Sequence, residues 1–147
     1  MAGITTAICN SFKKELMQAL HNLDSGGNAF KMALFIGTVA GTFGAGTTNY
    51  SNMGSDELAT AGGYTAGGTA MTMSGITEPG STARADASNV QWTAATFSTG
   101  GCLMYNTTNG NRSVAVWSFG GTQTVSSATF LIQTPAAGDA TSLLRIS

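Results

Sequence analysis

The stretch GCLMYNTTNGNRSVAVWSFGG at residues 101–121 decides the fold class. It holds two apolar runs, and the loop that joins them contains Asn109 followed by Gly110. An Asn-Gly pair between two apolar runs is one of the strongest short-range signals for a β-hairpin. Apolar residues fall on both faces of the second arm, which is typical of a strand that other elements cover on both sides. The stretch therefore predicts a hairpin within a layered β structure.

Strand patterns continue on both sides of this hairpin. AFKMALFIG at residues 29–37 and VQWTAATF at residues 90–97 predict strands upstream of it. ATFLIQTP at residues 128–135 and SLLRIS at residues 142–147 predict two more downstream. One helix followed by roughly six to eight strands, with no helices between them, predicts a mainly β fold. We expect an antiparallel β-sandwich or barrel, with a jelly roll among the allowed topologies.

Residues 6–23 carry the pattern of an amphipathic helix. Apolar residues recur there at spacings of three and four, Glu15 falls on the other side, and DSGGN at residues 24–28 ends the pattern. The apolar side can pack on the chain's own sheet or on a neighbouring subunit. We expect the chain's own sheet, because most helices owe their stability to their own core. The length fits a single domain, residues 1–147. Its predicted parts are the helix at 6–23, a glycine-rich arm or long loop at 37–68 and a strand-rich part at 69–147.

Charged residues make up 9% of the chain, far below the roughly one quarter that is typical of soluble domains, and the net charge is -1. Such a surface repels other copies only weakly, which suits a subunit of an assembly. The six Lys and Arg residues are scattered, which argues against direct nucleic-acid binding. The longest apolar run, MALFI at residues 32–36, is too short to span a bilayer, and the first residues lack the pattern of a secretory leader. We therefore expect no membrane partner and synthesis in the cytoplasm.

Residues able to carry out chemistry are few and dispersed. His21 is the only histidine, and we expect it to complement the C-terminal end of the predicted helix rather than to act in catalysis. Cys9 and Cys102 lack metal-ligand spacing and are expected to be reduced, partly buried thiols, although the sequence leaves a disulfide between them open. Acidic residues without the spacing of a calcium or zinc site are Asp24, Asp56, Glu57, Asp86 and Asp139. We therefore predict no catalytic site, no metal and no cofactor.

GGYTAGG at residues 62–68 places four glycines around one tyrosine. A phosphate-binding loop needs a lysine after its glycines, and both this stretch and GTFGAGTT at residues 41–48 lack it. Two hypotheses remain for the glycine-rich segment at residues 37–68. It is either an extended arm that contacts a neighbouring subunit, or an internal connection whose Tyr64 fills the domain's own core. The arm hypothesis assigns the contacts to Phe43, Tyr50, Tyr64, Gly62, Gly63, Gly67 and Gly68.

Several stretches, taken in order, resemble the small virion structural proteins of tailed bacteriophages. They are FKKELMQALHNL, FKMALFIG, YTAGG, VQWTAATF, CLMYNTTNGNRSVAVWSFGG and TFLIQTPAAGDATSLLRIS. The resemblance spans nearly the whole chain, and its most specific parts are GGYTAGG, LMYNTTNGNRSVAVWSFGG and PAAGDATSLLRI. It implies a non-enzymatic component of the virion, assembled in the cytoplasm of the host.

Small size, low charge and the lack of residues for chemistry favour a capsid cement or decoration protein, which binds the outside of the shell. Its expected partners are the major capsid protein and further copies of this chain, in a homo-oligomer. A neck, tail or fibre-attachment protein, in a small ring or trimer, is the alternative. A carbohydrate-binding module is less favoured, because Trp92 and Trp117 lie in strand patterns where burial is the more frequent outcome. The scattered acids argue against a cell-wall hydrolase, which needs a carboxylate pair or metal set in one cleft.

Overall fold

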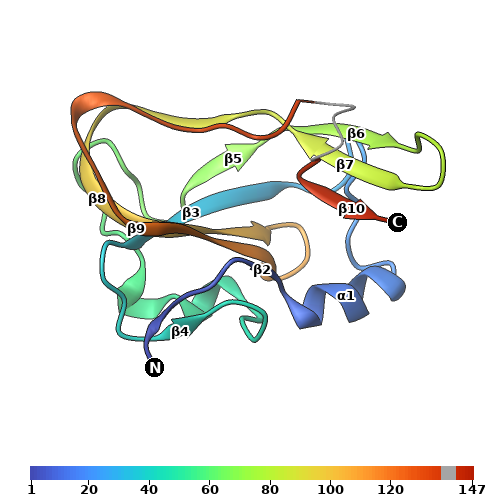
Figure 1. The fold of residues 1–147 in the computed structure, drawn as a ribbon, viewed down its shortest axis with the longest axis horizontal. Helices are drawn as coiled ribbons and strands as arrows, with labels where there is room; N and C mark the ends of the chain where they lie inside the picture. The colour runs from blue at the N-terminus through green and yellow to red at the C-terminus, as the bar shows by residue number, and fades with distance from the viewer. Residues whose placement is uncertain (137–141) are drawn as a thin grey trace.

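The computed structural model describes residues 1–136 and 142–147, and it confirms a mainly β fold with antiparallel sheets and one α-helix near the N-terminus (Figure 1). The elements in chain order are β1 (Gly3–Ile4), β2 (Ala7–Ile8), α1 (Asn10–Met17), β3 (Phe30–Ile36), β4 (Thr42–Phe43), the short 3-10 helices η1 (Tyr50–Asn52) and η2 (Gly54–Asp56), β5 (Thr69–Met71), β6 (Met73–Thr77), β7 (Ala83–Ala87), β8 (Val90–Asn106), β9 (Arg112–Ile132) and β10 (Leu144–Ile146). The predicted strand at residues 29–37 is β3, and the predicted hairpin at residues 101–121 is the inner half of the β8–β9 pair.

The described strands form three sheets. The largest has the order β2-β9-β8-β3-β5, the second has the order β10-β7-β6, and β1 pairs with β4 in a short parallel ladder. Within the described residues the sheets do not close into a barrel, so the fold is the sandwich-like alternative. Neighbours such as β6–β7 and β8–β9 are direct hairpins.

Strands β8 and β9 contribute to both layers of the protein. They have 17 and 21 residues, and they pair with each other along almost their whole length. The register shifts between Thr99 and Gly101. Glycines lie on both strands near this point: Gly100, Gly101, Gly120 and Gly121. Figure 1 shows the two strands turning back over the main sheet at one end. We call residues 90–99 of β8 and 123–132 of β9 the outer ribbon.

An aromatic cluster lies under the outer ribbon. Phe97 of β8 packs against Phe130 of β9, with ring centroids 5.4 Å apart. Tyr64 from the glycine-rich segment joins them, 6.0 Å from Trp92 and 6.2 Å from Phe97. Trp92 is 4% exposed and Tyr64 is 2% exposed, so this cluster belongs to the core. Burial of such large rings is among the strongest apolar contributions to folding.

The helix predicted over residues 6–23 is longer than the helix observed, which is α1 at Asn10–Met17. Before α1, the residues Ala7–Ile8 pair with β9 and are extended rather than helical. After α1, Ala19 has a φ of 59°, in the left-handed region where a right-handed helix cannot continue. The residues with the apolar periodicity therefore form a strand, a short helix and a turn. α1 packs against β9, as expected for a helix that covers its own sheet.

The glycine-rich segment reaches both layers. The carbonyl of Gly62 accepts a hydrogen bond from the N–H of Thr96 in β8 at 2.8 Å, and Gly68 lies against the backbone of Met32 in β3. Gly62 and Gly68 have φ values of +56° and +73°. A Cβ on Gly62 would overlap the carbonyl oxygen of Thr96, and one on Gly68 would overlap that of Met32. Only glycine combines this backbone conformation with such a close approach.

We expect Gly62→Ala and Gly68→Ala each to lower the free energy of unfolding by about 2 kcal/mol or more, because each adds an overlap to left-handed strain. Gly80→Ala measures the left-handed strain without an overlap, because Gly80 has a φ of +67° and open space around it. This variant should lower the free energy of unfolding by about 1 kcal/mol. Gly46 also has open space and no positive φ, so Gly46→Ala should change stability by less than about 0.5 kcal/mol. Urea unfolding followed by tryptophan fluorescence measures all four variants. If Gly62→Ala and Gly80→Ala lowered the free energy of unfolding equally, the close approach of Gly62 to the Thr96 carbonyl would be contradicted.

Candidate functional site

The residues assigned to an interaction arm lie within the protein's own fold. Tyr64 is 2% exposed and Phe43 is 4% exposed, with the Phe43 ring 4.5 Å from that of Phe35. Tyr50 is half-buried and stacks on Tyr105 at 4.5 Å. A Cβ on Gly62, Gly63 or Gly68 would lie 3.0 Å or less from backbone oxygens of the same chain, and one on Gly67 would lie 3.8 Å from the Tyr105 hydroxyl. The structure therefore has the internal connection with Tyr64 in the core, and not an extended arm, because Tyr64 and Phe43 are buried and Tyr50 stacks on a ring of the same chain.

Glu57 holds this segment in place. Its carboxylate accepts hydrogen bonds from the hydroxyls of Tyr50 at 2.6 Å and Tyr64 at 2.9 Å, and from the N–H of Gly67 at 2.6 Å. Tyr105 donates to the carbonyl of Gly67 at 2.6 Å. Burial, with the Glu57 charge nearby, raises the pKa of Tyr105 to about 12, so this hydroxyl remains a donor at neutral pH. Burial and the hydrogen bond to Glu57 also raise the pKa of Tyr50.

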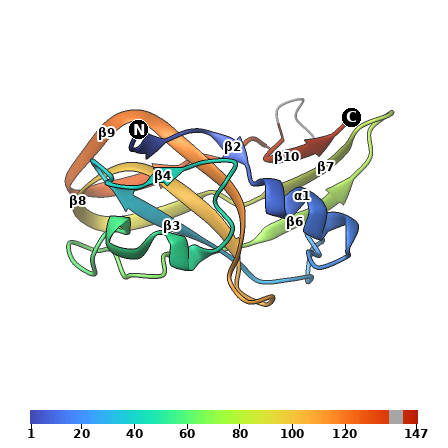
Figure 2. The same cartoon turned by 90° about the horizontal axis from the view of Figure 1, so that it is seen from below.

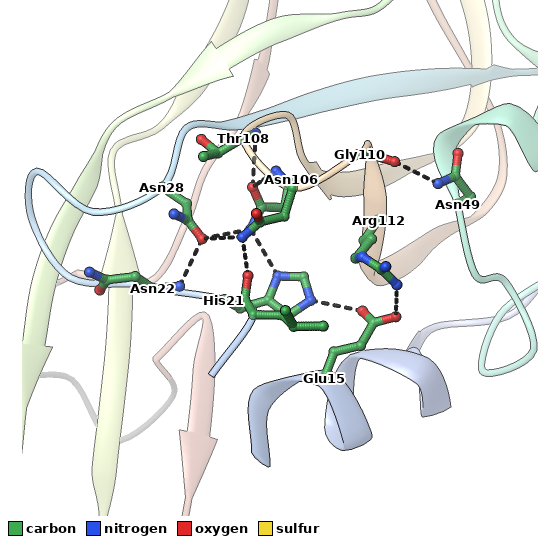
Figure 3. Close-up of polar contacts among 11 residues, drawn as sticks. Glu15, His21, Asn22, Asn28, Asn49, Asn106, Thr108, Gly110 and Arg112 are labelled. Carbon is green, nitrogen blue, oxygen red and sulfur yellow. Dashed lines mark hydrogen bonds and ion pairs between the residues drawn. The ribbon is translucent and has the colours of Figure 1, made fainter. Parts of the chain in front are cut away.

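His21 lies in a second polar cluster, between α1 and the β8–β9 turn (Figure 3). One ring nitrogen, Nε2, is 2.9 Å from Glu15 Oε2, and the other, Nδ1, is 3.0 Å from Asn106 Nδ2. The side-chain oxygen of Asn106, Oδ1, accepts hydrogen bonds from the backbone N–H groups of Thr108 and Asn109, which directs the side-chain NH2 group toward His21. Nδ1 therefore accepts a hydrogen bond, and Nε2 donates one to Glu15.

This position differs from the prediction that His21 complements the C-terminal end of the helix. His21 is 5% exposed and both ring nitrogens are engaged, because the chain after α1 turns back and brings the ring under Asn106. The cluster ties the helix to the hairpin turn. Its members are 6 residues apart for Glu15 and His21 but 85 apart for His21 and Asn106, so no sequence spacing indicates it.

Glu15 is the carboxylate that both His21 and Arg112 contact in this cluster. Arg112 Nη1 donates to Glu15 Oε1 at 2.8 Å, and the Glu15 side chain is 8% exposed. Burial alone would raise the pKa of this carboxyl group, but the hydrogen bonds from His21 and Arg112 outweigh burial and lower it. The ionised carboxylate therefore stabilises the fold at neutral pH.

The remaining candidates for chemistry are separate from one another. Cys9 and Cys102 are free, as predicted, and they are fully rather than partly buried. Burial, with the Glu15 charge nearby, raises the pKa of Cys9 to about 12 and keeps its thiol protonated. Asp56 accepts from the N–H groups of Ala40 and Gly41, both at 2.8 Å.

Residues 137–141, which include Asp139 and part of the PAAGDATSLLRI stretch, lie outside the described residues. In the part of the chain that the structure describes, no three His, Cys, Asp or Glu side chains gather in a group suited to a metal ion. No helix there combines the length and apolar character needed to cross a membrane. Comparisons with protein-family models, with curated proteins and with solved structures find no match.

The outer ribbon presents an open strand edge along β9. Strand β2 pairs with β9 only at Val116 and Ala115, and no described strand lies beside residues 123–132 on that side. The chain carries no charged residue over residues 113–134. Natural sheets usually protect such an edge with charges, prolines, bulges or a very short strand. Here two register shifts interrupt the ribbon, one near Ala94 of β8 and one near Ser127 of β9, with φ values of 50° and 49°. This uncharged edge is a candidate site for binding another chain.

The outer face of the ribbon is polar. Ser98 and Thr124 are directly opposite each other, and their hydroxyls form a hydrogen bond of 2.8 Å. Exposed polar side chains on the two strands include Gln91, Thr93, Thr96 and Thr129. Trp92 points the other way, into the core, and is therefore not available to stack on a sugar.

The lowered pKa of Glu15 predicts acid sensitivity. The ionised Glu15 carboxylate contributes its full stabilisation at a pH above 4.5, the pKa of the group in the unfolded chain. This stabilisation is lost as the pH falls through the lower pKa that Glu15 has in the folded protein. We expect Glu15→Gln to lower the free energy of unfolding by about 2 kcal/mol at pH 7, since it leaves Arg112 without its carboxylate partner. The difference from wild type should shrink below about pH 4. Urea unfolding between pH 7 and pH 3 measures it.

Glu78→Gln is the matched control, because Glu78 is exposed after β6 and should follow the wild-type profile. A Glu15→Gln difference that stays constant over the whole pH range would show that the ionised carboxylate is not the source of the effect.

Proposed function

We propose that this chain is a non-enzymatic structural protein of a bacteriophage virion, and specifically a capsid cement or decoration protein that binds and stabilises the outer shell. The open, uncharged edge of β9 at residues 123–132 is the observation that carries this proposal. The resemblance of the sequence to small virion proteins supports it independently. Assembly would take place in the cytoplasm of the host, as that resemblance implies.

An open strand edge is a ready interface. Its backbone N–H and C=O groups can pair with a strand of another subunit, which extends the sheet across the contact. Ten residues in a strand span about 33 Å, enough for several inter-subunit hydrogen bonds. Since residues 123–132 carry no charge, two such edges can meet without like-charge repulsion.

The polar face beside this edge fits the same role. Hydroxyl and amide groups cost less to desolvate than charged groups, and they can form new hydrogen bonds across a contact. A cement protein uses modest contacts of this kind at many equivalent positions. The partners under this proposal are the major capsid protein and neighbouring copies of the chain.

Quantitative mass spectrometry of purified virions from the source phage tests this function. We expect a copy number comparable to that of the major capsid protein, because a cement protein occupies positions all over the shell. A small number that fits one ring would place the protein in the neck, tail or fibres instead. Absence from the particles would exclude a structural role in the virion.

A lysine at the edge tests the contact itself. Thr129 is exposed on β9, so Thr129→Lys should leave folding unchanged while it introduces charge repulsion at the edge. We expect at least about a ten-fold loss of binding to shells that lack the protein, measured by co-sedimentation. Gln91→Lys is the control, since Gln91 is also exposed but lies on β8, across the ribbon from the open edge. Equal binding by the two variants would contradict a contact through β9.

A further inference from the structure

The turn between β8 and β9 contains a chemically reactive pair, Asn109 followed by Gly110. Asn109 is the only asparagine of the chain that precedes a glycine. An asparagine in a polypeptide loses ammonia when the backbone nitrogen of the next residue attacks its side-chain carboxamide carbon. Glycine has no Cβ to obstruct this attack, and its backbone reaches conformations that other residues avoid. The pair that forms the hairpin turn is therefore also the most reactive asparagine position in the sequence.

The structure leaves the attacking nitrogen free. Gly110 is exposed and has a φ of +65°, and a Cβ at this position would meet open space. The β8–β9 ladder ends at the pair of Asn106 with Arg112, so the Gly110 N–H lies outside the ladder. Among the hydrogen bonds between described residues, none is donated by this N–H. Base in the solvent therefore reaches the Gly110 nitrogen without breaking a strand contact.

The carboxamide of Asn109 holds the turn against the chain that follows α1. Its Nδ2 donates to the carbonyl of Leu20 and to Oδ1 of Asn28, the latter at 3.3 Å. Leu20 is 89 residues away in sequence, and Figure 2 shows the turn beside the chain that follows α1. Asn28 Oδ1 also accepts a hydrogen bond from Asn106 Nδ2 at 2.9 Å (Figure 3). One side-chain amide therefore links the hairpin turn to the segment at residues 20–28.

We propose that Asn109 is a site of spontaneous deamidation, and that this modification detaches the β8–β9 turn from residues 20–28. Base in the solvent removes the proton of the Gly110 N–H, and the nitrogen attacks Asn109 Cγ. The bond from Cγ to Nδ2 breaks, and Nδ2 leaves as ammonia with a proton from water. A further water molecule opens the cyclic imide and leaves an aspartate or an isoaspartate, without oxidation or reduction of any atom.

The modification reverses the chemistry of the contact. A carboxylate only accepts hydrogen bonds, so the product places its oxygens against two other acceptors, the Leu20 carbonyl and Asn28 Oδ1. Asn28 cannot turn its NH2 group toward the new carboxylate without losing its bonds from the Asn22 N–H and from Asn106. Asn109 is half-buried, so the new charge is also partly desolvated. The proposal does not depend on the virion assignment, because it concerns a turn of the chain itself.

Peptide mapping by mass spectrometry tests the site. The full chain is incubated at pH 8, folded or unfolded in guanidinium chloride, and the mass gain from amide to acid is located. We expect Asn109 to react before every other asparagine of the folded chain. We also expect its reaction to be at least about ten-fold slower than in the unfolded chain, because ring closure waits until the bonds to Leu20 and Asn28 open. Earlier reaction of another asparagine, equal rates in the two states, or an unmodified Asn109 once the unfolded sample has converted would overturn the proposal.

Two asparagines of the same turn provide matched variants. Asn109→Asp and Asn111→Asp both add one carboxylate, and Asn111 is exposed with a φ of 58°, a conformation that aspartate also tolerates. Only Asn109→Asp removes the donor to Leu20 and Asn28. Hydrogen exchange measures the result: the amides of residues 20–28 should exchange at least about ten-fold faster in Asn109→Asp than in wild type. Asn111→Asp should match wild type, and equal exchange in the two variants would refute detachment of the turn.

Discussion

The backbone of Leu34 sets the constraint on which the arrangement of the layers depends. Leu34 is fully buried in β3, and β5 pairs with β3 only as far as Met32. A buried N–H or C=O without a partner costs about 1–3 kcal/mol, so both groups of Leu34 need partners from elsewhere in the chain. The Tyr64 hydroxyl accepts from the Leu34 N–H at 3.0 Å, and the Leu58 N–H donates to the Leu34 carbonyl at 2.9 Å. The glycine-rich segment therefore replaces a strand at this edge.

That replacement also positions the outer ribbon. The Tyr64 ring points from the edge of β3 toward Trp92 and Phe97, so the ribbon buries its aromatic side chains only by folding back over this segment. The two backbone contacts, Gly62 with β8 and Gly68 with β3, then fix the chain against each layer. The short, uncharged motif at residues 62–68 thus provides a hydrogen-bond partner for the edge of β3 and packs Tyr64 against the aromatic side chains of the outer ribbon.

Local patterns determine how much of this fold can be predicted from the sequence. The hairpin at residues 101–121 and the strand at residues 29–37 depend on alternation and on an Asn-Gly turn, and both signals lie within a few residues. The helix was predicted too long because its first residues pair with β9, a contact more than one hundred residues away in sequence. The cluster of Glu15, His21 and Asn106 has no sequence signal, since tertiary packing alone brings its members together. A groove between α1 and the sheet of β6, β7 and β10 is equally non-local, because its described apolar residues come from five separate elements: β2, α1, β6, β7 and β10.

Two exposed surfaces of the protein, the edge of β9 and the groove beside α1, differ in their chemistry. The edge of β9 offers backbone hydrogen bonds without charge, which suits pairing with identical copies. The groove between α1 and the sheet of β6, β7 and β10 instead exposes apolar side chains, among them Met17, Ile76 and Ile146. The described lining residues of the groove include none of the residues 123–132, so the two surfaces are separate. Under the proposed function, two modest contacts on one body would reinforce each other through effective concentration, and a small, weakly charged chain would then hold an assembly together without a large interface at either surface.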